Sequence, residues 1–444
     1  MRTVTAKFGG SSLADAAQIR KAADIVRADP ARTVVVASAP GKRFSGDTKI
    51  TDLLYRCYDL AAVGADFSEP FSVLADRFSA IVQELGVSYD LASELDVIRG
   101  HLRTDPQRDY TASRGEYLNA GILASYLGAA FLDAADLVRF DAEGRFQQAE
   151  TDRLLGAALE KERFAVLPGF YGSMPDGTVR TFSRGGSDVT GSLCARAAGA
   201  RLYENWTDVS GVLFSDPRIA DNPGTIPMLT YRELRELSYM GASVLHEDAV
   251  FPVSSAGIPI HICNTNRPAD AGTWIVPELP ENMQAPTVTG VAGKKGFTSI
   301  TLDKSMMNRE VGFGAELLAV FARHGISFEH CPSGIDTMSV IVNTAQFAPE
   351  RERILDELRA ELQPEQLVTE DAMALIAVVG HGMVRARGIA ARIFGALADG
   401  GINIRMIDQG SSEMNIIIGV NESDFEAAIR VICDACQPIR FYAP

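Results

Sequence analysis

An internal repeat in the last third of this 444-residue sequence limits the folds open to the chain more than any other feature. The segment VGFGAELLAVFARHGIS (311–327) aligns without gaps with RGIAARIFGALADGGIN (387–403), at an offset of 76 residues (387 − 311). The same offset aligns the apolar run Met338–Val342 with Met414–Ile418. Each copy has a glycine, an amphipathic helix, a second glycine, a strand, a turn and a strongly apolar strand. The repeat therefore predicts two copies of a small βαββ module, which bury their sheets by pairing.

The first part of the chain predicts a different architecture, a parallel α/β sheet. Val4–Phe8 and Val34–Ala37 are apolar strand candidates, and Leu13–Ala28 between them has apolar residues at helical spacing. A strand, a helix and a second strand in this order begin a parallel sheet. Residues 50–128 are rich in Ala, Leu, Glu and Arg, which favour helices. Further strand candidates follow at Ala130–Leu132, Phe164–Leu167, Arg201–Trp206 and Ile258–Cys263.

These patterns predict one large domain followed by a regulatory pair of modules. We expect an α/β domain over residues 1–276, with an open, mainly parallel sheet sandwiched by helices. A linker over 277–290 begins with the proline-containing segment PELPENMQAP. The first βαββ module is expected over 291–370 and the second over 371–444.

Composition excludes several classes of function. The net charge is −15 and no basic face is visible, so we expect no nucleic-acid binding. The chain has neither a signal-peptide pattern nor an apolar run near the roughly 20 residues that span a bilayer, so a cytoplasmic protein without membrane contact is expected. The six cysteines are scattered, and the pair Cys433 and Cys436 has no histidine nearby. Buried, reduced thiols are therefore expected rather than a redox or metal site.

Two glycine-rich junctions give the first indication of chemistry. KFGGSS (7–12) follows the first strand, but its lysine precedes the glycines, whereas a P-loop has its lysine after them. FSRGGSD (182–188) combines an arginine, paired glycines and a carboxylate before a helix. Each junction alone is also compatible with an ordinary turn or helix cap. Together, at the carboxyl ends of parallel strands, they favour a site for a phosphate and a charged substrate.

Two further segments have weaker signals. Glu116 of SRGEYLNAGIL (113–123) is also explained by a solvated first helical turn, and ENWTDVSGVLFSDPR (204–218) by ordinary turn chemistry. None of the six histidines lies in these four segments, and no metal-binding spacing is present. A phosphoryl acceptor that is already anionic, such as a carboxylate, needs no general base. It needs cations and N–H donors, with Mg²⁺ on the phosphates.

The segments KFGGSSLA, SRGE, GFYGSMPDGTVRTFSRGGSDVTG, WTDVSGV…DPR and SYMGASVLHEDAV, in this order and followed by the repeat, resemble the aspartate kinases. These are members of the amino-acid kinase family with tandem ACT regulatory domains, and the resemblance covers essentially the whole chain. It implies ATP- and Mg²⁺-dependent phosphorylation of the β-carboxylate of L-aspartate to 4-phospho-L-aspartate. That reaction opens the route to lysine, threonine and methionine. No fused homoserine dehydrogenase is expected after the second module.

The resemblance also implies roles for individual residues. Lys7 is expected to bridge the transferring phosphoryl group, and Asp188 to orient Lys7. Arg184 is expected to hold the α-carboxylate of aspartate and Glu116 its α-amino group. The expected aspartate-binding residues are Ser38, Thr51, Glu116, Arg184 and Ser187. The expected nucleotide-binding residues are Lys7, Gly9, Gly10, Ser11, Thr207, Asp208, Leu213, Arg218 and Ser243; relatives often have lysine in place of Ser243.

The repeat implies regulation through the modules. Lysine is the first choice of effector and threonine the second, and the sequence does not separate them. Glu329 is expected to hold the effector's amino group, although a plain surface charge explains it equally well. A homodimer or a dimer of dimers formed through the modules is expected. The expected effector-binding residues are Asn308, Gly312, Phe313, Ser327, Glu329 and Asn403.

Two other interpretations of the function stay open at this point. Another amino-acid kinase, acting on glutamate, carbamate or UMP, would share the glycine loops. A catalytically weak amino-acid sensor would share the modules, but Lys7 and Asp188 are both present. A dinucleotide dehydrogenase is disfavoured because no G-x-G-x-x-G pattern follows the first strand.

Overall fold

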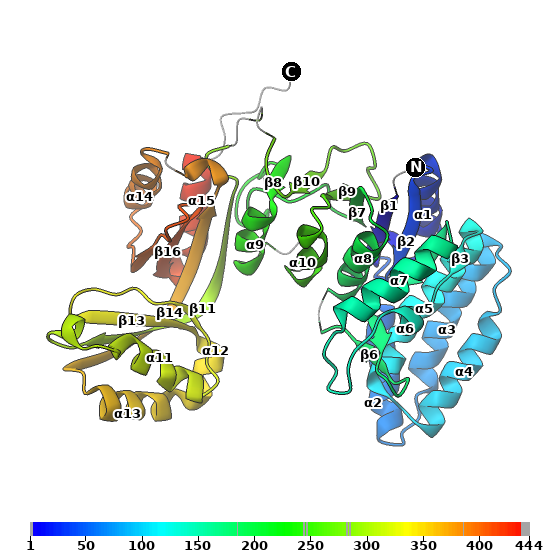
Figure 1. Ribbon diagram of the computed structural model, residues 1–444, viewed down its shortest axis with the longest axis horizontal. Helices are drawn as coiled ribbons and strands as arrows, with labels where there is room; N and C mark the ends of the chain where they lie inside the picture. The colour runs from blue at the N-terminus through cyan, green and yellow to red at the C-terminus, as the bar shows by residue number, and fades with distance from the viewer. Residues whose placement is uncertain are drawn as a thin grey trace. The chain divides into compact units, whose positions relative to one another are not determined.

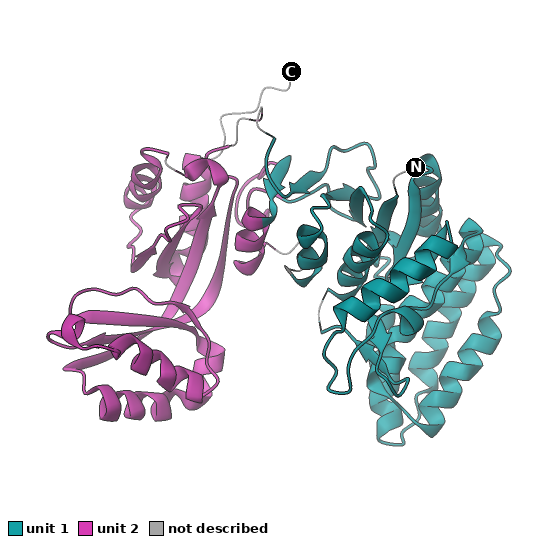
Figure 2. Cartoon of the chain, in the orientation of Figure 1, with its two compact units in different colours: residues 1–212, 225–231, 243–280 teal, residues 213–224, 232–242, 281–444 magenta. Residues whose placement is uncertain are grey.

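The structure is a computed structural model that describes residues 3–183, 185–242, 245, 247–280, 283, 286–384 and 386–436. The chain divides into two compact units (Figure 2). The first consists of Met1–Val212, Thr225–Tyr231 and Ser243–Pro280. The second consists of Leu213–Gly224, Arg232–Ala242 and Glu281–Pro444. The expected single boundary at residue 276 does not coincide with these units, since two earlier segments cluster with the second one.

The first unit is built on a sheet in the order β3-β4-β2-β1-β7-β9-β10-β8 (Figure 1). All neighbouring pairs are parallel except β9 and β10, which are antiparallel. This confirms the mainly parallel α/β sheet. The strands are β1 (Val4–Phe8), β2 (Arg32–Ala37), β3 (Ala130–Phe131), β4 (Ala165–Pro168), β7 (Leu202–Thr207), β8 (Met228–Thr230), β9 (Ile260–Asn264) and β10 (Thr273–Val276). A separate hairpin pairs β5 (Tyr171–Ser173) with β6 (Val179–Thr181).

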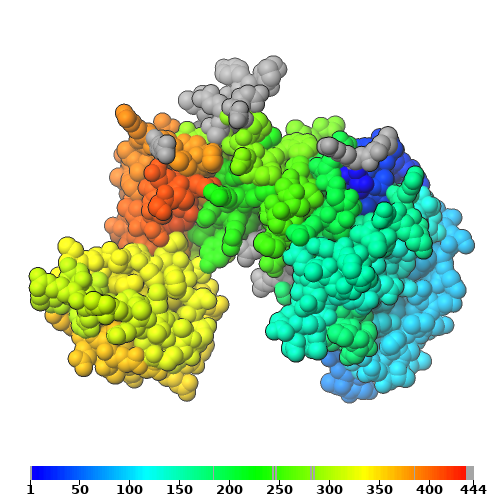
Figure 3. Space-filling model, viewed as in Figure 1, coloured from blue at the N-terminus to red at the C-terminus, as the bar shows by residue number. Residues whose placement is uncertain are grey.

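Helices flank this sheet. Residues 50–128, which the composition predicted to be mostly helical, form four of them. In the space-filling view, the light-blue to teal segment that holds α3 to α7 forms most of the visible face of this unit (Figure 3). Helix α5 is buried over most of its length, at residues 111–116 and 118–124, so the polar residues there must find partners inside the protein. The helices are α1 (Ala16–Ala28), α2 (Ile50–Ala62), α3 (Ser68–Leu85), α4 (Leu91–Thr104), α5 (Arg108–Leu127), α6 (Ala134–Leu137), α7 (Gln148–Lys161), α8 (Gly186–Ala197) and α10 (Glu247–Ser255), with a 3₁₀ turn η1 at Ser11–Leu13.

The second unit contains an antiparallel sheet in the order β12-β13-β11-β14-β16-β15. Its strands are β11 (Gly290–Asp303), β12 (Phe328–His330), β13 (Thr337–Asn343), β14 (Gln366–Val379), β15 (Met406–Asp408) and β16 (Asn415–Asn421). Its helices are α9 (Tyr231–Tyr239), of which only Tyr231 belongs to the first unit, α11 (Phe313–Arg323), α12 (Thr344–Phe347), α13 (Arg351–Leu362), α14 (Ile389–Asp399) and α15 (Phe425–Cys436). Short 3₁₀ turns lie at Met307–Arg309, Ala348–Glu350, His381–Met383 and Glu422–Asp424.

The repeat is visible in the bounds of the elements. Strand β14 begins and ends 76 residues after β11 (366 − 290 and 379 − 303), and α14 follows α11 by the same offset (389 − 313). Each copy also ends in a helix, α13 or α15, that the predicted βαββ pattern lacked.

The last strand of each copy corrects the sequence alignment. In the first copy Ile300 pairs with Val340, and in the second the equivalent Ile376 pairs with Ile418. That offset is 78 (418 − 340), so the match of Met338–Val342 with Met414–Ile418 is wrong by two residues. Because side chains alternate along a strand, a shift by two keeps the same face inward and the apolar pattern could not reveal it.

Strands β11 and β14 form one long antiparallel ribbon that both modules share. The second half of β11 pairs with β13, and the second half of β14 pairs with β16. Each half has its own apolar core, one around Ile300, Leu317 and Val340 and the other around Ile376, Ile393 and Ile418. Phe214 and Ala220 belong to the second core, which explains why segment 213–224 clusters with this unit.

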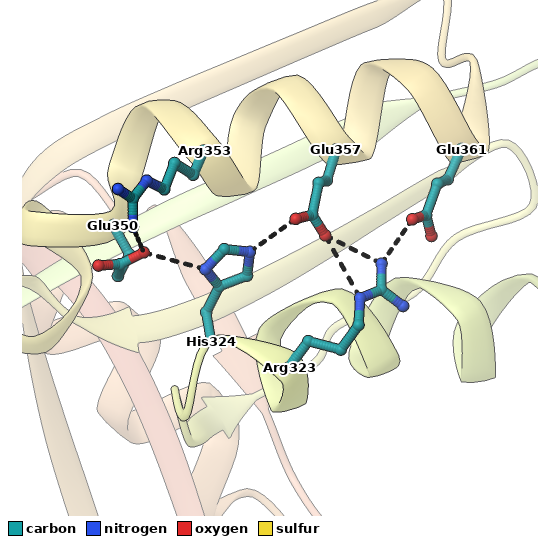
Figure 4. Close-up of polar contacts among 6 residues, drawn as sticks. All are labelled: Arg323, His324, Glu350, Arg353, Glu357 and Glu361. Atoms are coloured by element: carbon teal, nitrogen blue, oxygen red, sulfur yellow. Dashed lines mark hydrogen bonds and ion pairs between the residues drawn. The ribbon is translucent and has the colours of Figure 1, made fainter.

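A polar cluster joins α11 to α13 in the first module (Figure 4). The ring of His324 bridges Glu350 at 3.1 Å and Glu357 at 3.0 Å, and Arg323 contacts Glu357 and Glu361. The hydrogen bonds to Glu357 and then Glu350 raise the pKa of His324. The pKa of Glu350 is lowered, chiefly by His324, and that of Glu357 chiefly by Arg323. Protonated His324 therefore stabilises the contact between the two helices.

This cluster predicts a pH dependence of stability. The raised pKa of His324 means that its contribution is full below the ordinary histidine pKa and is lost as pH rises through the raised value. The lowered carboxylate pKa values mean that theirs is lost only in acid. We expect His324→Gln to lower the melting temperature more at about pH 6 than at about pH 9. Equal losses at both pH values, measured by thermal unfolding, would contradict this account.

Candidate functional site

The two glycine-rich junctions meet at the carboxyl edge of the central strands. Lys7 projects from the end of β1 and is 7% exposed. Its Nζ lies 2.5 Å from Oδ1 of Asp188, in the first turn of α8. Gly185 precedes α8 with a φ of 57°, in the left-handed region that glycine adopts without strain. Two segments about 180 residues apart in sequence thus place a cation and an anion in direct contact.

Asn205 completes this cluster and was missed by the sequence predictions. It lies on β7 beside Lys7 in the parallel register, and it is 2% exposed. Its Nδ2 donates to Oδ1 of Asp188 at 3.0 Å. The available signal was an asparagine within an otherwise buried central strand, since such a polar group needs partners.

The loop after β1 is packed tightly against the loop after β2. The N–H of Gly9 donates to the carbonyl of Trp206 at 2.9 Å, and that of Gly41 donates to the carbonyl of Gly10 at 2.8 Å. A Cβ added at Gly10 would lie 2.9 Å from the carbonyl oxygen of Ala39, and one at Gly41 would lie 2.6 Å from the backbone of Gly10. Only glycine fits at either position. The close backbone contact fixes the loop that follows Lys7 and the end of β1.

An arginine in α3 holds these loops in place. Arg77 is 5% exposed, and its guanidinium donates to the carbonyls of Ala14, Gly41 and Thr48. Asp47 lies 3.5 Å away and also pairs with Arg43. Sequence reasoning missed Arg77 because its acceptors are backbone carbonyls, which leave no residue signature.

Glu116 occupies a buried position on α5 beside the end of β2. The N–H of Ala39 donates to its carboxyl group, but Oε2 has no partner among the described residues. Burial raises the pKa of Glu116 to about 8, and the nearby Arg114 offsets this only weakly. The guanidinium of Arg114 faces the rings of Tyr110, Tyr117 and Tyr171 instead. Such a carboxyl group, with an empty acceptor position, suits a ligand that brings an ammonium group.

The other expected aspartate-binding residues lie along the same edge where they are described. The buried Ser38 follows β2, and its carbonyl accepts from Nδ2 of Asn119 at 2.7 Å. Thr51 is in the first turn of α2, and Ser187 is in the first turn of α8, against Gly169 at the end of β4. Arg184 lies outside the described residues.

The expected nucleotide-binding residues are spread over both units. Thr207 ends β7, and its hydroxyl donates to Oδ1 of the exposed Asp208 at 3.2 Å. Leu213 and Arg218 belong to the second unit, where Arg218 pairs with Asp216 at 2.6 Å. Ser243 lies outside the described residues. The geometry therefore brings Thr207 and Asp208, with Gly9, Gly10 and Ser11, to the carboxyl edge of the sheet in the first unit.

The expected effector residues lie in the second unit. Gly312 precedes α11 with a φ of 96°, and Phe313 is buried in the core of the first module. The carboxylate of Glu329 accepts a hydrogen bond from Tyr239 of α9, so it is not a plain surface charge. Asn308 and Ser327 are exposed on either side of α11.

Asn403 is the repeat counterpart of Ser327 (403 − 327 = 76). It lines a polar hollow of about 520 Å³ together with Glu370, Asp371, Arg405 and Asn421. Arg405 donates to Oε2 of Glu370 at 3.0 Å within this hollow. Asn403 thus belongs to the second module, whereas Gly312 and Glu329 belong to the first.

No group of three or more His, Cys, Asp or Glu side chains in the described residues could hold a metal ion. Within the same residues, no helix has the length and apolar character needed to cross a membrane. Cys433 and Cys436 are buried in α15, and burial raises the pKa of Cys436 to about 11.

Comparison with known proteins shows the family of this chain. Residues 2–264 match the family model described as the amino acid kinase family, and residues 376–436 match an ACT domain. The chain is 39% identical to aspartokinase 3 of Bacillus subtilis, over 96% of this chain and 97% of that one.

Solved structures match over almost the whole chain. Aspartate kinase of Clostridium acetobutylicum superposes with a TM-score of 0.87 at 46% identity, covering 98% of this chain and 100% of that one. Escherichia coli aspartokinase III, in complex with aspartate and ADP, superposes with a TM-score of 0.76 at 25% identity, covering 98% and 99%. The same enzyme with lysine and aspartate gives 0.71 at 26% identity, again covering 98% and 99%.

Proposed function

The chain belongs to the aspartokinases of the amino acid kinase family, and on this premise we propose how its residues bind the substrates, transfer the phosphoryl group and respond to an effector. The reaction is phosphorylation of a carboxyl group of aspartate. We assign it to the β-carboxylate, with ATP as donor and 4-phospho-L-aspartate as product. The observation that carries the proposal is the contact of Lys7 with Asp188 at the carboxyl edge of the sheet, in the same unit as the buried Glu116.

Lys7 has the central role in the transfer. A carboxylate oxygen of aspartate attacks the γ-phosphorus of ATP, the bond from that phosphorus to the bridging oxygen breaks, and the electron pair leaves with ADP. Both reactants are anions, so the site must offset their repulsion rather than remove a proton. The Lys7 ammonium supplies positive charge, Gly9, Gly10 and Ser11 supply backbone near it, and Asp188 directs the lysine.

Glu116 has the matching role for aspartate. Its carboxyl group, with Oε2 unpartnered among the described residues, receives the α-ammonium group of the substrate. Ser38, Thr51 and Ser187 line the rest of the aspartate pocket, and Arg184 holds the α-carboxylate. Discrimination against other acids then depends on the distance between these groups and Lys7.

Within the first unit, the nucleotide is assigned to Thr207, Asp208 and Ser243, together with Lys7 and its glycine loop. The complex of the E. coli enzyme with ADP supports nucleotide binding by this fold. Mg²⁺ is proposed to enter on the phosphates of ATP, where it neutralises part of their charge. This fits a chain that offers single carboxylates such as Asp188, since Mg²⁺ usually takes one or two carboxylates and keeps phosphate and water ligands.

Regulation is assigned to the ACT modules, with lysine as the first effector and threonine as the second. The E. coli relatives support this, because one is described as lysine-sensitive and its structure was solved with lysine. The effector is proposed to contact Asn308, Gly312, Phe313, Ser327 and Glu329, with Asn403 at the corresponding place of the second module.

We further propose that modules of two chains pair, giving a homodimer or a dimer of dimers in the cytoplasm. The enzyme then stands at the first step toward lysine, threonine and methionine.

The effector assignment predicts the behaviour of one variant. Replacing Glu329 by glutamine removes the charge that would hold an ammonium group. The lysine concentration for half-maximal inhibition should rise about tenfold or more, as for loss of a charged hydrogen bond. Glu352→Gln, an exposed glutamate on α13 of the same module, is the matched control. Unchanged lysine inhibition in Glu329→Gln would remove this residue from the site.

The substrate assignment is tested by ADP release in a coupled assay. Turnover should require L-aspartate and should be absent with L-glutamate, D-aspartate or no acceptor. Turnover with glutamate but not with aspartate would overturn the assignment. Titration of lysine and threonine in the same assay then identifies the effector.

A further inference from the structure

Asn205 contacts both members of the ion pair at the carboxyl edge. Its side-chain oxygen lies 3.4 Å from Nζ of Lys7, and its Nδ2 lies 3.0 Å from Oδ1 of Asp188. The ion pair itself spans 2.5 Å. The three side chains come from β1, β7 and α8, so the triangle joins two neighbouring strands to the helix that carries Asp188.

The two charged partners fix the orientation of the amide. A carboxylate only accepts hydrogen bonds and an ammonium only donates them, so the NH₂ group must face Asp188 and the oxygen must face Lys7. On its other side the register neighbour of Asn205 is Ile262 of β9, which is apolar. The phenol of Tyr203 donates to the backbone carbonyl of Asp188 at 3.2 Å. Among the described residues, Lys7 and Asp188 are therefore the charged groups that contact this amide.

We propose that Asn205 is a positioning residue for phosphoryl transfer, which anchors the Asp188 carboxylate and directs the Lys7 ammonium. A lysine ammonium is a point charge on a flexible four-carbon stem, so a single carboxylate contact leaves its direction loosely defined. A second acceptor, held rigidly on the neighbouring strand, restricts that direction. The donation from Asn205 goes to the same Oδ1 of Asp188 that Lys7 contacts, so it also fixes the position of that oxygen. The inference rests on the role proposed above for Lys7.

A purely structural role for a buried, satisfied asparagine is the rival explanation, and it predicts different kinetics. A structural residue affects the melting temperature and the amount of active enzyme. A positioning residue lowers kcat while the KM values for ATP and aspartate change little, because the substrates contact other groups. A misplaced reacting group costs about a hundredfold in rate.

Two variants separate these explanations. Asn205→Leu keeps the size of the side chain and removes both hydrogen bonds, so kcat should fall about a hundredfold with folding retained. Asn205→Asp introduces a carboxyl group that can donate to Asp188 only when it is protonated. Its kcat relative to wild type should therefore recover as pH falls from about 8 to about 6, since carboxyl groups that share one site cannot both ionise easily. Asn415→Leu, an asparagine on β16 that donates to Glu236, is the control.

Each outcome decides the question. The inference stands if kcat falls in Asn205→Leu and the activity of Asn205→Asp recovers in acid. It is overturned if Asn205→Leu keeps kcat within about twofold of wild type, or if the pH profile of Asn205→Asp parallels that of wild type. Lys7→Met is measured in parallel. If that variant is fully active, the proposed role of Lys7 fails first; if it is inactive while Asn205→Leu is normal, only the present inference fails.

Discussion

Replacing Lys7 by methionine is expected to reduce the rate of phosphoryl transfer about a thousandfold or more, because no other cation in the described structure contacts Asp188 at this edge. Methionine keeps most of the volume of the lysine stem and removes only the charge. The ammonium is needed while two anions approach each other, so the loss should appear in kcat more than in the KM for aspartate. Initial rates of ADP release, at saturating substrates, measure the effect.

Two controls keep this result specific. Lys161→Met changes an exposed lysine on α7 and should leave kcat unchanged. The melting temperature of Lys7→Met should stay close to that of wild type, since Asn205 still donates to Asp188. A Lys7→Met enzyme within about tenfold of wild-type kcat would remove Lys7 from the chemistry.

Replacing Glu116 by glutamine is expected to weaken aspartate capture and, at the same time, to stabilise the fold. Loss of the negative charge removes the partner of the α-ammonium group, so the KM for aspartate should rise about a hundredfold, as for a buried charged hydrogen bond. The KM for ATP should stay unchanged. Steady-state kinetics with each substrate varied in turn distinguish this result from a general loss of activity.

The stability effect follows from the raised pKa of Glu116, which burial brings to about 8. In the folded protein the group keeps its proton up to that value, whereas in the unfolded chain it loses the proton near its ordinary pKa of 4.5. Unfolding therefore becomes easier as pH rises between these two values. Glutamine does not ionise in the unfolded chain, so its stability has no such pH dependence. The free energy of unfolding of the variant should exceed that of wild type by on the order of 2–4 kcal/mol at about pH 7.5 and by little at about pH 4.5. A stability difference that does not change with pH would contradict this explanation.

The same pKa shift predicts how aspartate binding responds to pH. An ammonium group at Glu116 favours the ionised carboxylate, so binding releases the proton that burial had retained. Aspartate affinity should accordingly rise with pH between about 6 and about 8 in the wild type and lose this dependence in Glu116→Gln. The trade between stability and binding is typical of functional sites.

The sequence predicted much of the fold because its strongest signals are local. Strand β1 has the predicted bounds Val4–Phe8, and the strands at 130, 164, 201 and 258 lie within two residues of prediction. The repeat at offset 76 gives the bounds of β14 and α14 from those of β11 and α11. In the helices the apolar residues recur with a period of 3.6. The strands show either a period of 2 or an uninterrupted apolar run.

The remaining differences come from interactions between distant segments. Helix α9 lies within the α/β part of the sequence, yet it belongs mostly to the second unit, where Glu233 accepts from Thr289 at 2.6 Å. Nothing in the composition of α9 marks that partner. The two-residue error in the last strand of the repeat arose because only pairing sets register, and pairing is not local.

The residues of the site also divide into those that a local sequence pattern predicts and those whose partners are distant in sequence. Lys7 and Asp188 could be predicted because glycine loops beside charged residues have a sequence pattern, and the structure places them in contact. Asn205 and Arg77 were missed, because their partners are a carboxylate from α8 and backbone carbonyls of two loops. The protonation of Glu116 depends on the burial of this part of α5, which the sequence around a glutamate does not reveal.

The central claim is that this edge of the sheet phosphorylates the β-carboxylate of aspartate, and trapping the acyl phosphate tests it most directly. The enzyme is incubated with ATP, Mg²⁺, L-aspartate and hydroxylamine, and the hydroxamate is identified by mass spectrometry and counted against ADP. We predict aspartyl-β-hydroxamate in equal amounts with ADP for the wild type, and none for Lys7→Met. ADP release without hydroxamate, hydroxamate from glutamate but not aspartate, or undiminished product from Lys7→Met would contradict the account.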